Sequence, residues 1–503
     1  MRSGGRRSTL ARAARRGGTL LVMLLVAMIG TVAWRTTRLR APTASADTPV
    51  LATHETVDTA RAVLHLSTAL RFQTVSHEDA SEDTPAAWEA QRAWLVRTYP
   101  AFHANATREL VGAGTLLYTW RGSAPELAPI ILMAHQDVVP AATEATAGAA
   151  NPWQVPPFSG ELRDGAIWGR GAVDDKGSLI SLFEALETLS ERGFTPKRTI
   201  YLVSGHDEET LGLGAHAAAQ VLLARGVHAL YALDEGLFVL SDHPITHHAA
   251  ALIAVAEKGF ATLKITARAA GGHSSAPPDE GAVVTLSRAL LAIMNHPAPL
   301  KVTALSEQML RALAPQLGLP ARIAVANRWL FSPLLVAQFA ATPAGAAMLH
   351  TTMAPTVLQG SLKSNVLPEV VVGKINYRLA PGDSAAAALA RARQAVGTLP
   401  VELAWDAPVR EASTVSSSVA PPYRVLAALA ADIWAAPAAP ALMIAGTDGT
   451  QMSTVAQAVY RFQPIRLSLA ESAMIHGRDE HLALSSLTKM IEFYTRLVLT
   501  TAG

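Results

Sequence analysis

Short apolar runs alternate with segments of helical spacing in the first half of the chain. The apolar runs at residues 128–134, 198–204 and 229–233 are too short for helices and end in polar residues, so they predict buried strands. Two amphipathic segments between them, 178–192 and 214–225, predict helices. Strands that alternate with helices in this way predict an α/β layer with a mainly parallel central sheet.

The pattern changes after residue 256 and returns to the first type after residue 410. In between, alternating strands are expected at 261–267 and 370–379, with a helix at 281–295 and a long Leu/Ala-rich region. This combination of alternating strands and helical segments predicts an inserted α+β domain. The expected division is a basic N-terminal segment with linker at 1–46, a larger domain formed by 47–256 and 411–503, and the insertion at 257–410.

The N-terminus carries an apolar run of 16 residues without a charge, residues 19–34, with six arginines before it and three after. This charge bias favours an N-terminus in the cytoplasm and a body outside, in a bacterial periplasm. We expect an uncleaved membrane anchor. A removed signal, which would give a secreted protein, stays open because Ala44-Ser45-Ala46 resembles a cleavage site.

Composition excludes several classes of protein. Of 503 residues, 50% are hydrophobic and 16% charged, which excludes a mainly disordered chain. Nine of the 42 Lys and Arg lie in residues 1–46, and the rest of the chain is net acidic, so no nucleic-acid partner is expected. The chain has no cysteine. Any metal must therefore be held by His, Asp and Glu.

Five polar segments follow predicted strands or lie in loops. They are residues 134–137 (AHQD), 169–177 (GRGAVDDKG), 205–209 (GHDEE), 233–236 (LDEG) and 475–480 (IHGRDE). Each segment alone is weak evidence for a functional site. A Glu-Glu pair usually lies in a solvated loop, and Asp-Asp before Lys-Gly is an ordinary N-cap. Together they supply imidazoles and carboxylates at the edge where α/β sheets carry their sites. Such a set suits divalent ions such as zinc.

With these segments and further motifs, the sequence resembles the two-zinc exopeptidase and aminoacylase family, in its carboxypeptidase S and N-fatty-acyl-amino-acid hydrolase/synthase branch. The further motifs are residues 257–259 (EKG), 272–278 (GHSSAPP), 364–368 (SNVLP), 376–378 (NYR) and 446–448 (GTD). The resemblance covers about residues 55–500. It implies a zinc-exopeptidase-like catalytic domain with a mainly parallel central sheet, plus an inserted α+β lid or dimerisation domain.

The resemblance also implies roles for particular residues of the five segments. The implied ligands of two zinc ions are His135, His476, Asp174, Glu209 and Asp234, with Asp174 bridging both ions and Glu235 as an alternative to Asp234. Glu208 would be the general base, and Asp137 would orient His135. A cis peptide is implied after Asp174.

The inserted domain is expected to contribute as well. The resemblance implies that His273 stabilises the oxyanion, and that Asn365 and Arg378 hold the substrate carboxylate. From the residues alone, His273 reads as part of a Gly/Ser/Pro turn. In dimeric relatives this histidine reaches the partner subunit, so a homodimer through the inserted domain stays open.

These residues predict a metal-dependent hydrolase that cleaves an amide bond next to a free carboxylate. The substrate is a peptide or, alternatively, an N-acyl amino acid, and residues 329–348 would line an apolar groove or form core. An inactive metal-binding or interaction protein on the same fold is the remaining alternative. Lys176 and Arg170 are expected to pair structurally rather than to act in catalysis.

Overall fold

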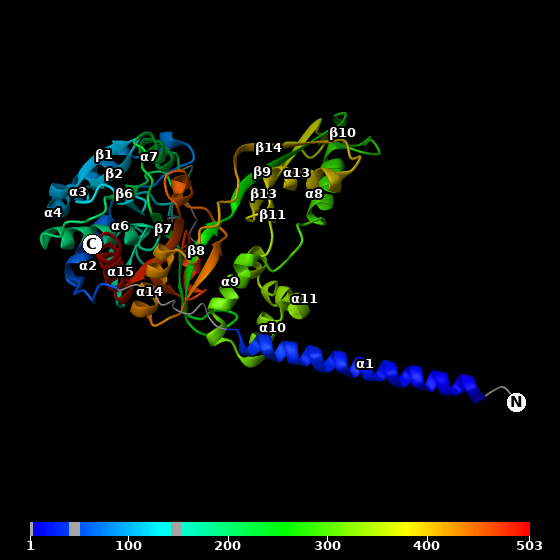
Figure 1. Cartoon of the computed structure of the whole chain (residues 1–503). Helices are drawn as coiled ribbons and strands as arrows, with labels where there is room; N and C mark the ends of the chain where they lie inside the picture. Colours follow the sequence, from blue (N-terminus) through cyan, green and yellow to red (C-terminus); the bar gives the residue numbers. More distant parts are fainter. Residues whose placement is uncertain (1–3, 40–50, 142–152, 211) are drawn as a thin grey trace.

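The computed structural model describes residues 4–39, 51–141, 153–210 and 212–503. It has a large α/β lobe, a smaller lobe and a long N-terminal helix (Figure 1). The expected cleavage site, residues 44–46, lies outside the described residues. In the large lobe the elements are α2 (Thr59–Ala69), η1 (Ala80–Glu82), α3 (Pro85–Thr98), α4 (Pro100–Asn105), β1 (Thr107–Val111), β2 (Thr115–Trp120), β3 (Ile130–Met133), β4 (Glu161–Arg163), β5 (Ala166–Trp168), α6 (Lys176–Glu191), β6 (Ile200–Ser204), α7 (Leu213–Ala224), β7 (Tyr231–Leu240), β8 (Ala250–Glu257), α14 (Pro421–Trp434), β15 (Ala438–Met443), η3 (Asp448–Thr454), β16 (Val459–Leu467), η4 (Glu471–Met474), β17 (His481–Ala483) and α15 (Leu484–Ala502).

A twisted eight-stranded sheet forms the centre of the large lobe, in the order β1-β2-β6-β3-β7-β16-β8-β15. The pairs β3–β6, β3–β7, β7–β16 and β8–β15 are parallel, as the α/β pattern predicts. Helices cover both faces: Ile130 and Leu132 of β3 pack in the core with α6, α14 and α15, while Ile131 and Met133 pack with α7 on the opposite face. Because neighbouring residues of a strand point to opposite faces, a fully buried strand must be apolar throughout.

The smaller lobe is built on a four-stranded antiparallel sheet in the order β11-β13-β9-β14. Its elements are β9 (Gly259–Arg268), β10 (Gly272–His273), α8 (Ala282–Met294), β11 (Thr352–Gln359), β12 (Val366–Leu367), β13 (Val370–Leu379), α13 (Ala385–Val396) and β14 (Val401–Arg410). Helices α8 and α13 pack on one face of this sheet, on the side turned away from the large lobe (Figure 1). The chain enters this lobe at Gly259, where a Cβ would lie 2.4 Å from the Arg410 carbonyl oxygen, so the crossing requires glycine.

A helical region, residues 304–347, lies between α8 and β11 in the sequence, so the chain leaves the small sheet after α8 and returns to it at β11. It comprises α9 (Ala304–Ala312), η2 (Ala314–Gln316), α10 (Leu319–Ala326), α11 (Arg328–Phe339) and α12 (Pro343–Ala347). Leu335 and Phe339 of α11 are buried in one cluster with Ala439 and Ala441 of β15. The apolar residues of this stretch are therefore partly core, packed against the edge of the central sheet, while Trp329 and Leu334 are exposed.

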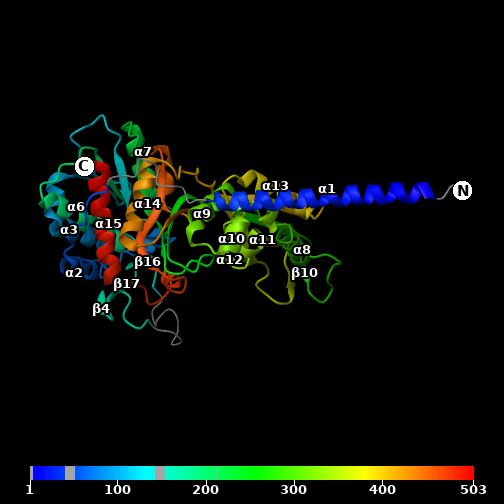
Figure 2. The same cartoon turned by 60° about the horizontal axis from the view of Figure 1, so that its bottom comes forward.

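Helix α1 (Gly4–Thr37) projects from this helical region (Figures 1 and 2). Its segment Gly18–Thr37 has a mean hydropathy of 1.8, with none of its apolar window buried, and is the one helix of the described chain long and apolar enough to span a membrane. A signal sequence would share these features. The Asn327 side-chain amide donates hydrogen bonds to the Val32 carbonyl and the Thr36 hydroxyl, both at 3.2 Å. These contacts fasten the C-terminal end of α1 to α10.

Candidate metal centre and active site

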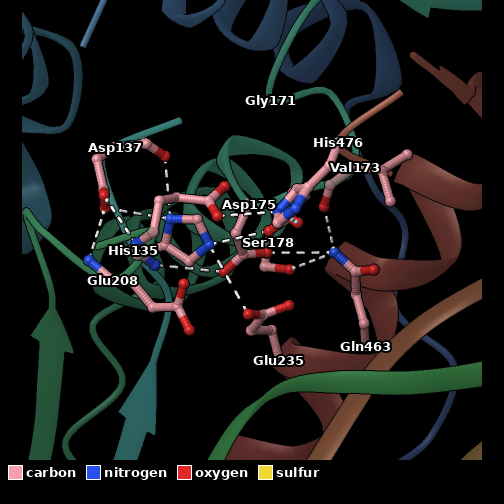
Figure 3. Close-up of polar contacts among 12 residues, drawn as sticks. His135, Asp137, Gly171, Val173, Asp175, Ser178, Glu208, Glu235, Gln463 and His476 are labelled. Carbon is pink, nitrogen blue, oxygen red and sulfur yellow. Dashed lines mark hydrogen bonds and ion pairs between the residues drawn. The ribbon is translucent and has the colours of Figure 1, made fainter. Parts of the chain in front are cut away.

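Five chain segments bring imidazoles and carboxylates together beyond the carboxyl ends of the parallel strands (Figure 3). His135 follows β3, the Glu208–Glu209 pair follows β6 in a turn, and Asp174 precedes α6. Leu132 of β3 pairs with Leu233 of β7, so the parallel register carries His135 toward Glu235, two residues further along β7. The position agrees with the rule that α/β sheets hold their sites at this edge.

Asp174 lies between the two histidines and uses a different oxygen for each. Its Oδ1 is 3.0 Å from His135 Nε2 and its Oδ2 is 3.0 Å from His476 Nε2. Burial opposes ionisation, but the hydrogen bonds from His135 and His476 hold the pKa of Asp174 below its ordinary value. The hydrogen bonds that His476 donates to Asp174 and Glu209 raise the pKa of His476 to about 10. The expected cis peptide at Asp174–Asp175 is present.

Two further carboxylates complete two overlapping groups of three ligand atoms, each group within 4.8 Å. The groups are His135, Asp174 and Glu235, and Asp174, Glu209 and His476. Glu209 Oε2 is 2.9 Å from His476 Nε2 and Glu235 Oε1 is 3.8 Å from His135 Nε2. Glu209 Oε1 is buried without a hydrogen-bond partner, and such an orphaned acceptor suits a cation. Asp174 is the residue the two groups share.

The expected ligand Asp234 does not point into either group. Its Oδ2 accepts a hydrogen bond from the Gly449 N–H at 2.5 Å, and its Oδ1 accepts one from the Glu235 N–H at 3.0 Å. The structure thus places the alternative, Glu235, in the cluster, and Asp234 in contact with the loop that contains Gly449. Neighbouring residues of β7 point in opposite directions, which separates the two carboxylates.

Asp137 is fully buried and links three parts of the cluster. His135 Nδ1 lies 3.0 Å from the Asp137 carbonyl and 3.3 Å from its Oδ1. The two carboxylate oxygens also accept the backbone N–H groups of Glu208 and Glu209, at 3.3 and 3.1 Å, and the Ser76 hydroxyl at 2.7 Å. Asp137 therefore orients the His135 ring and holds the glutamate turn against it.

Glu208 lies beside the cluster but belongs to neither ligand group. Figure 3 shows its carboxylate near the His135 ring. Burial raises its pKa well above the ordinary value, and the nearby carboxylates Asp448 and Glu209 add to the effect. A carboxyl group that keeps its proton closer to neutral pH is suited to accept and return a proton during catalysis.

One supporting residue, Glu480, was not assigned a role from the sequence. It is fully buried, and its oxygens accept the backbone N–H groups of Gly171, Val173 and Asp174 at 2.8–3.0 Å. Its Oε2 also pairs with Arg170 at 2.7 Å, which confirms the structural pairing expected for Arg170. The signal in the sequence was its position four residues after His476, at the end of the fifth polar segment. Glu480 fixes the loop that presents Asp174.

Three expected site residues of the inserted domain lie outside the cluster. His273 is exposed, and its Nδ1 is 2.8 Å from the Ser275 hydroxyl. Asn365 lies next to it in space, because the Asn365 carbonyl accepts a hydrogen bond from the Ser274 N–H at 3.1 Å. Arg378 lies at the other end of β13, about 25 Å away by the rise of an extended strand. The structure therefore does not bring Asn365 and Arg378 to one carboxylate within a single chain.

Comparisons with known proteins agree with this geometry. Residues 131–500 match Peptidase family M20/M25/M40. The N-fatty-acyl-amino acid synthase/hydrolase PM20D1 of Homo sapiens is 33% identical over 444 residues, which cover 86% of this chain and 86% of that protein. Probable carboxypeptidase S-like 2 of Dictyostelium discoideum is 30% identical over 443 residues, 87% of this chain and 84% of that protein.

Solved structures show the same fold. The M20 family metallo-carboxypeptidase Sso-CP2 from Sulfolobus solfataricus matches with a TM-score of 0.63 and 13% identity, covering 87% of this chain and 98% of that one. Human carnosine dipeptidase 1 matches with a TM-score of 0.62 and 14% identity, covering 88% and 96%.

Proposed function

This chain belongs to Peptidase family M20/M25/M40, and on that premise we propose that its paired ligand groups hold two zinc ions for the hydrolysis of an amide bond next to a free carboxylate. Membership makes the chain a metal-dependent enzyme that hydrolyses amide bonds. The observation that carries the two-ion proposal is Asp174, whose two oxygens face two histidines from opposite sides.

The donor set fits this assignment. His135, Asp174 and Glu235 would hold one ion, and Asp174, Glu209 and His476 the other. Imidazole and carboxylate without thiolate suit zinc in a catalytic site, and the orphaned Glu209 Oε1 supplies a free acceptor. When bound, the ions supply Lewis acidity, which polarises an amide carbonyl and acidifies water.

The chain's own groups would handle the proton and the substrate. Glu208 would take a proton from water and return it to the departing amine nitrogen. Asp137 would keep the His135 ring in one tautomer by accepting at Nδ1. Arg378 would bind the substrate carboxylate. The proposed oxyanion role of His273 requires the inserted domain to close or a second copy to supply it, since β10 lies at the far end of that lobe (Figure 1).

The substrate proposal rests on the relatives. A peptide substrate is favoured by the carboxypeptidase S-like relative, and an N-acyl amino acid by PM20D1 at comparable coverage. A hydrolysis screen of the zinc-loaded protein against dipeptides and N-acyl amino acids with matched C-terminal residues tests both. Turnover of neither class, with two ions bound, would reject the proposed function.

The choice between Asp234 and Glu235 is directly testable. Glu235→Gln should lower the zinc content toward one ion per chain, because Glu235 faces His135. Asp234→Asn should retain two ions, because the Asp234 oxygens accept backbone N–H groups instead. Metal analysis of the two purified variants decides the assignment. The reverse pattern would restore Asp234 as the ligand.

We also propose that α1 is retained as a membrane anchor with the catalytic body outside the cytoplasm. Its 20-residue span and the preceding arginines support this orientation. The full chain should stay in membranes after an alkaline carbonate wash and dissolve in detergent. Intact-mass measurement should find residues 1–46 still attached. A mature protein that begins after residue 46 would instead identify a removed signal.

A further inference from the structure

Two arginines flank one phenylalanine at the base of the inserted sheet. Phe260 of β9 is paired in register with Arg378 of β13 on one side and with Arg410 of β14 on the other. The guanidinium carbons lie 5.0 and 5.9 Å from the centre of the Phe260 ring, within range of a cation–π contact. We call these three residues the Arg–Phe–Arg row.

The row belongs to the open face of the sheet. Residues Ala261 and Leu263 of β9 pack under α8 and α13, so Phe260, one residue earlier, points to the opposite face. On that face the next cation along β13, Lys374, has an acid partner, Asp406, at 2.6 Å.

Neither arginine of the row has such a partner. Among the residues that the structure describes, the Arg378 and Arg410 side chains form no ion pair, although both are partly buried. The nearby acids are engaged elsewhere: Glu257 binds the buried Arg461 at 2.5 Å, and Glu411 accepts the Ala385 N–H at 3.1 Å. Partly buried cations without a direct ion-pair partner are costly, so the row is suited to an anionic ligand.

The row also lies where the inserted domain meets the large lobe. Gly259 and Arg410 are in backbone contact at the two chain crossings. The Glu257 carboxylate, two residues before Gly259, accepts the Thr447 hydroxyl at 3.3 Å. Two residues after Thr447, the Gly449 N–H binds Asp234, the neighbour of Glu235. A short series of contacts thus joins the row to the proposed metal ligands.

The Arg–Phe–Arg row and the nearby Lys258 together carry more positive charge than a single arginine. Lys258 follows Glu257, and burial together with the Arg378 charge lowers the pKa of Lys258 to about 8. Burial and then the charge of Arg410 lower the pKa of Arg378, and the negative charge of Glu257 opposes this shift. One substrate carboxylate would neutralise only part of this charge.

We propose that Arg410 is a second anion-binding residue of the substrate site, and that Arg378 and Arg410 together select substrates whose amino-acid part carries two carboxylates, as in N-acyl-glutamate or a C-terminal Asp or Glu. The proposal rests on the proposed function, and it adds a residue and a substrate class to it. Arg378 binds the α-carboxylate and Arg410 the side-chain carboxylate.

The test compares N-acyl-glutamate with N-acyl-glutamine, which are nearly isosteric and differ in one charge. The zinc-loaded enzyme should favour the glutamate substrate in kcat/KM by roughly tenfold to a hundredfold, the range expected for one charge-assisted hydrogen bond. Arg410→Gln should abolish this preference, and Arg410→Lys should keep part of it. Arg378→Ala should weaken both substrates.

Arg268→Ala is the matched control, since Arg268 lies on the far end of β9 and pairs with Glu402 at 3.5 Å; it should leave the preference unchanged. Equal turnover of the two substrates by the native enzyme, or an equal loss on both in Arg410→Gln, overturns the proposal. Calorimetric measurement of the binding of both compounds to the zinc-loaded Glu208→Gln variant tests the Arg410 assignment separately from the proposed hydrolysis. Selective glutamate binding without any turnover in the native enzyme would reject the proposed hydrolysis and retain the Arg410 assignment.

Discussion

Glu208→Gln should lower kcat by about 10²–10⁴-fold, the usual contribution of a general base, while the protein still binds two zinc ions. The amide of glutamine has nearly the same shape as the carboxylate but cannot accept a proton. Glu208 belongs to neither ligand group, so its replacement removes no donor from an ion. The measurement is steady-state kinetics together with metal analysis of the same preparation.

The neighbouring residue supplies the control for this prediction. Glu209→Gln should lose metal, because Glu209 Oε2 lies 2.9 Å from His476 Nε2 in the second ligand group. Both residues sit in one turn held by Asp137, so a general disturbance of the turn would affect both variants alike. Retained turnover in Glu208→Gln at full zinc occupancy would remove its role as the base.

Asp174→Ala should eliminate both zinc ions and reduce turnover to background. Asp174 is the one member common to the two ligand groups, and its loss also leaves the two histidines without the carboxylate between them. A ligand that binds only the folded state at a hundred times its Kd stabilises it by about 2.7 kcal/mol. The zinc-dependent increase in Tm should therefore disappear in this variant.

His476→Ala should lower the zinc content less than Asp174→Ala does. His476 belongs only to the second ligand group and its side chain is 53% exposed, so this variant should keep about one ion per chain and part of the zinc-dependent increase in Tm. An Asp174→Ala variant that still carried two ions would contradict the proposal that Asp174 is a ligand common to both groups. His476→Ala with full occupancy would remove His476 from the ligand set.

The alternation of apolar and amphipathic segments predicted most of the architecture. β3, β6, α6 and α7 lie within about two residues of their expected positions, because buried parallel strands need continuous apolar runs. The expected strand at 229–233 was too short, since β7 continues to Leu240. Beyond the expected end at residue 233, β7 contains Asp234, Glu235 and Gly236, polar and glycine residues that interrupt the pattern of a buried strand.

The packing of the helical region could not be predicted in the same way. Its Leu/Ala-rich sequence marks it as helical and partly buried, but not which surface it covers. The structure places Leu335 and Phe339 in one buried cluster with Ala439 and Ala441 of β15, about a hundred residues away in sequence. Hydrophobic burial is non-directional, so composition alone does not specify the partner.

By itself, the sequence determined the chemical types available to the centre. It supplies imidazoles and carboxylates without any thiol, in five segments that all lie within the residues matched by a known family. The tertiary structure decided which of these groups meet. In the folded chain Glu235, rather than Asp234, points toward His135. Glu480 holds the loop that contains Asp174. Arg410 and Arg378 lie on either side of Phe260. Side-chain direction and strand register arise from pairing between distant segments, and a linear pattern does not contain that information.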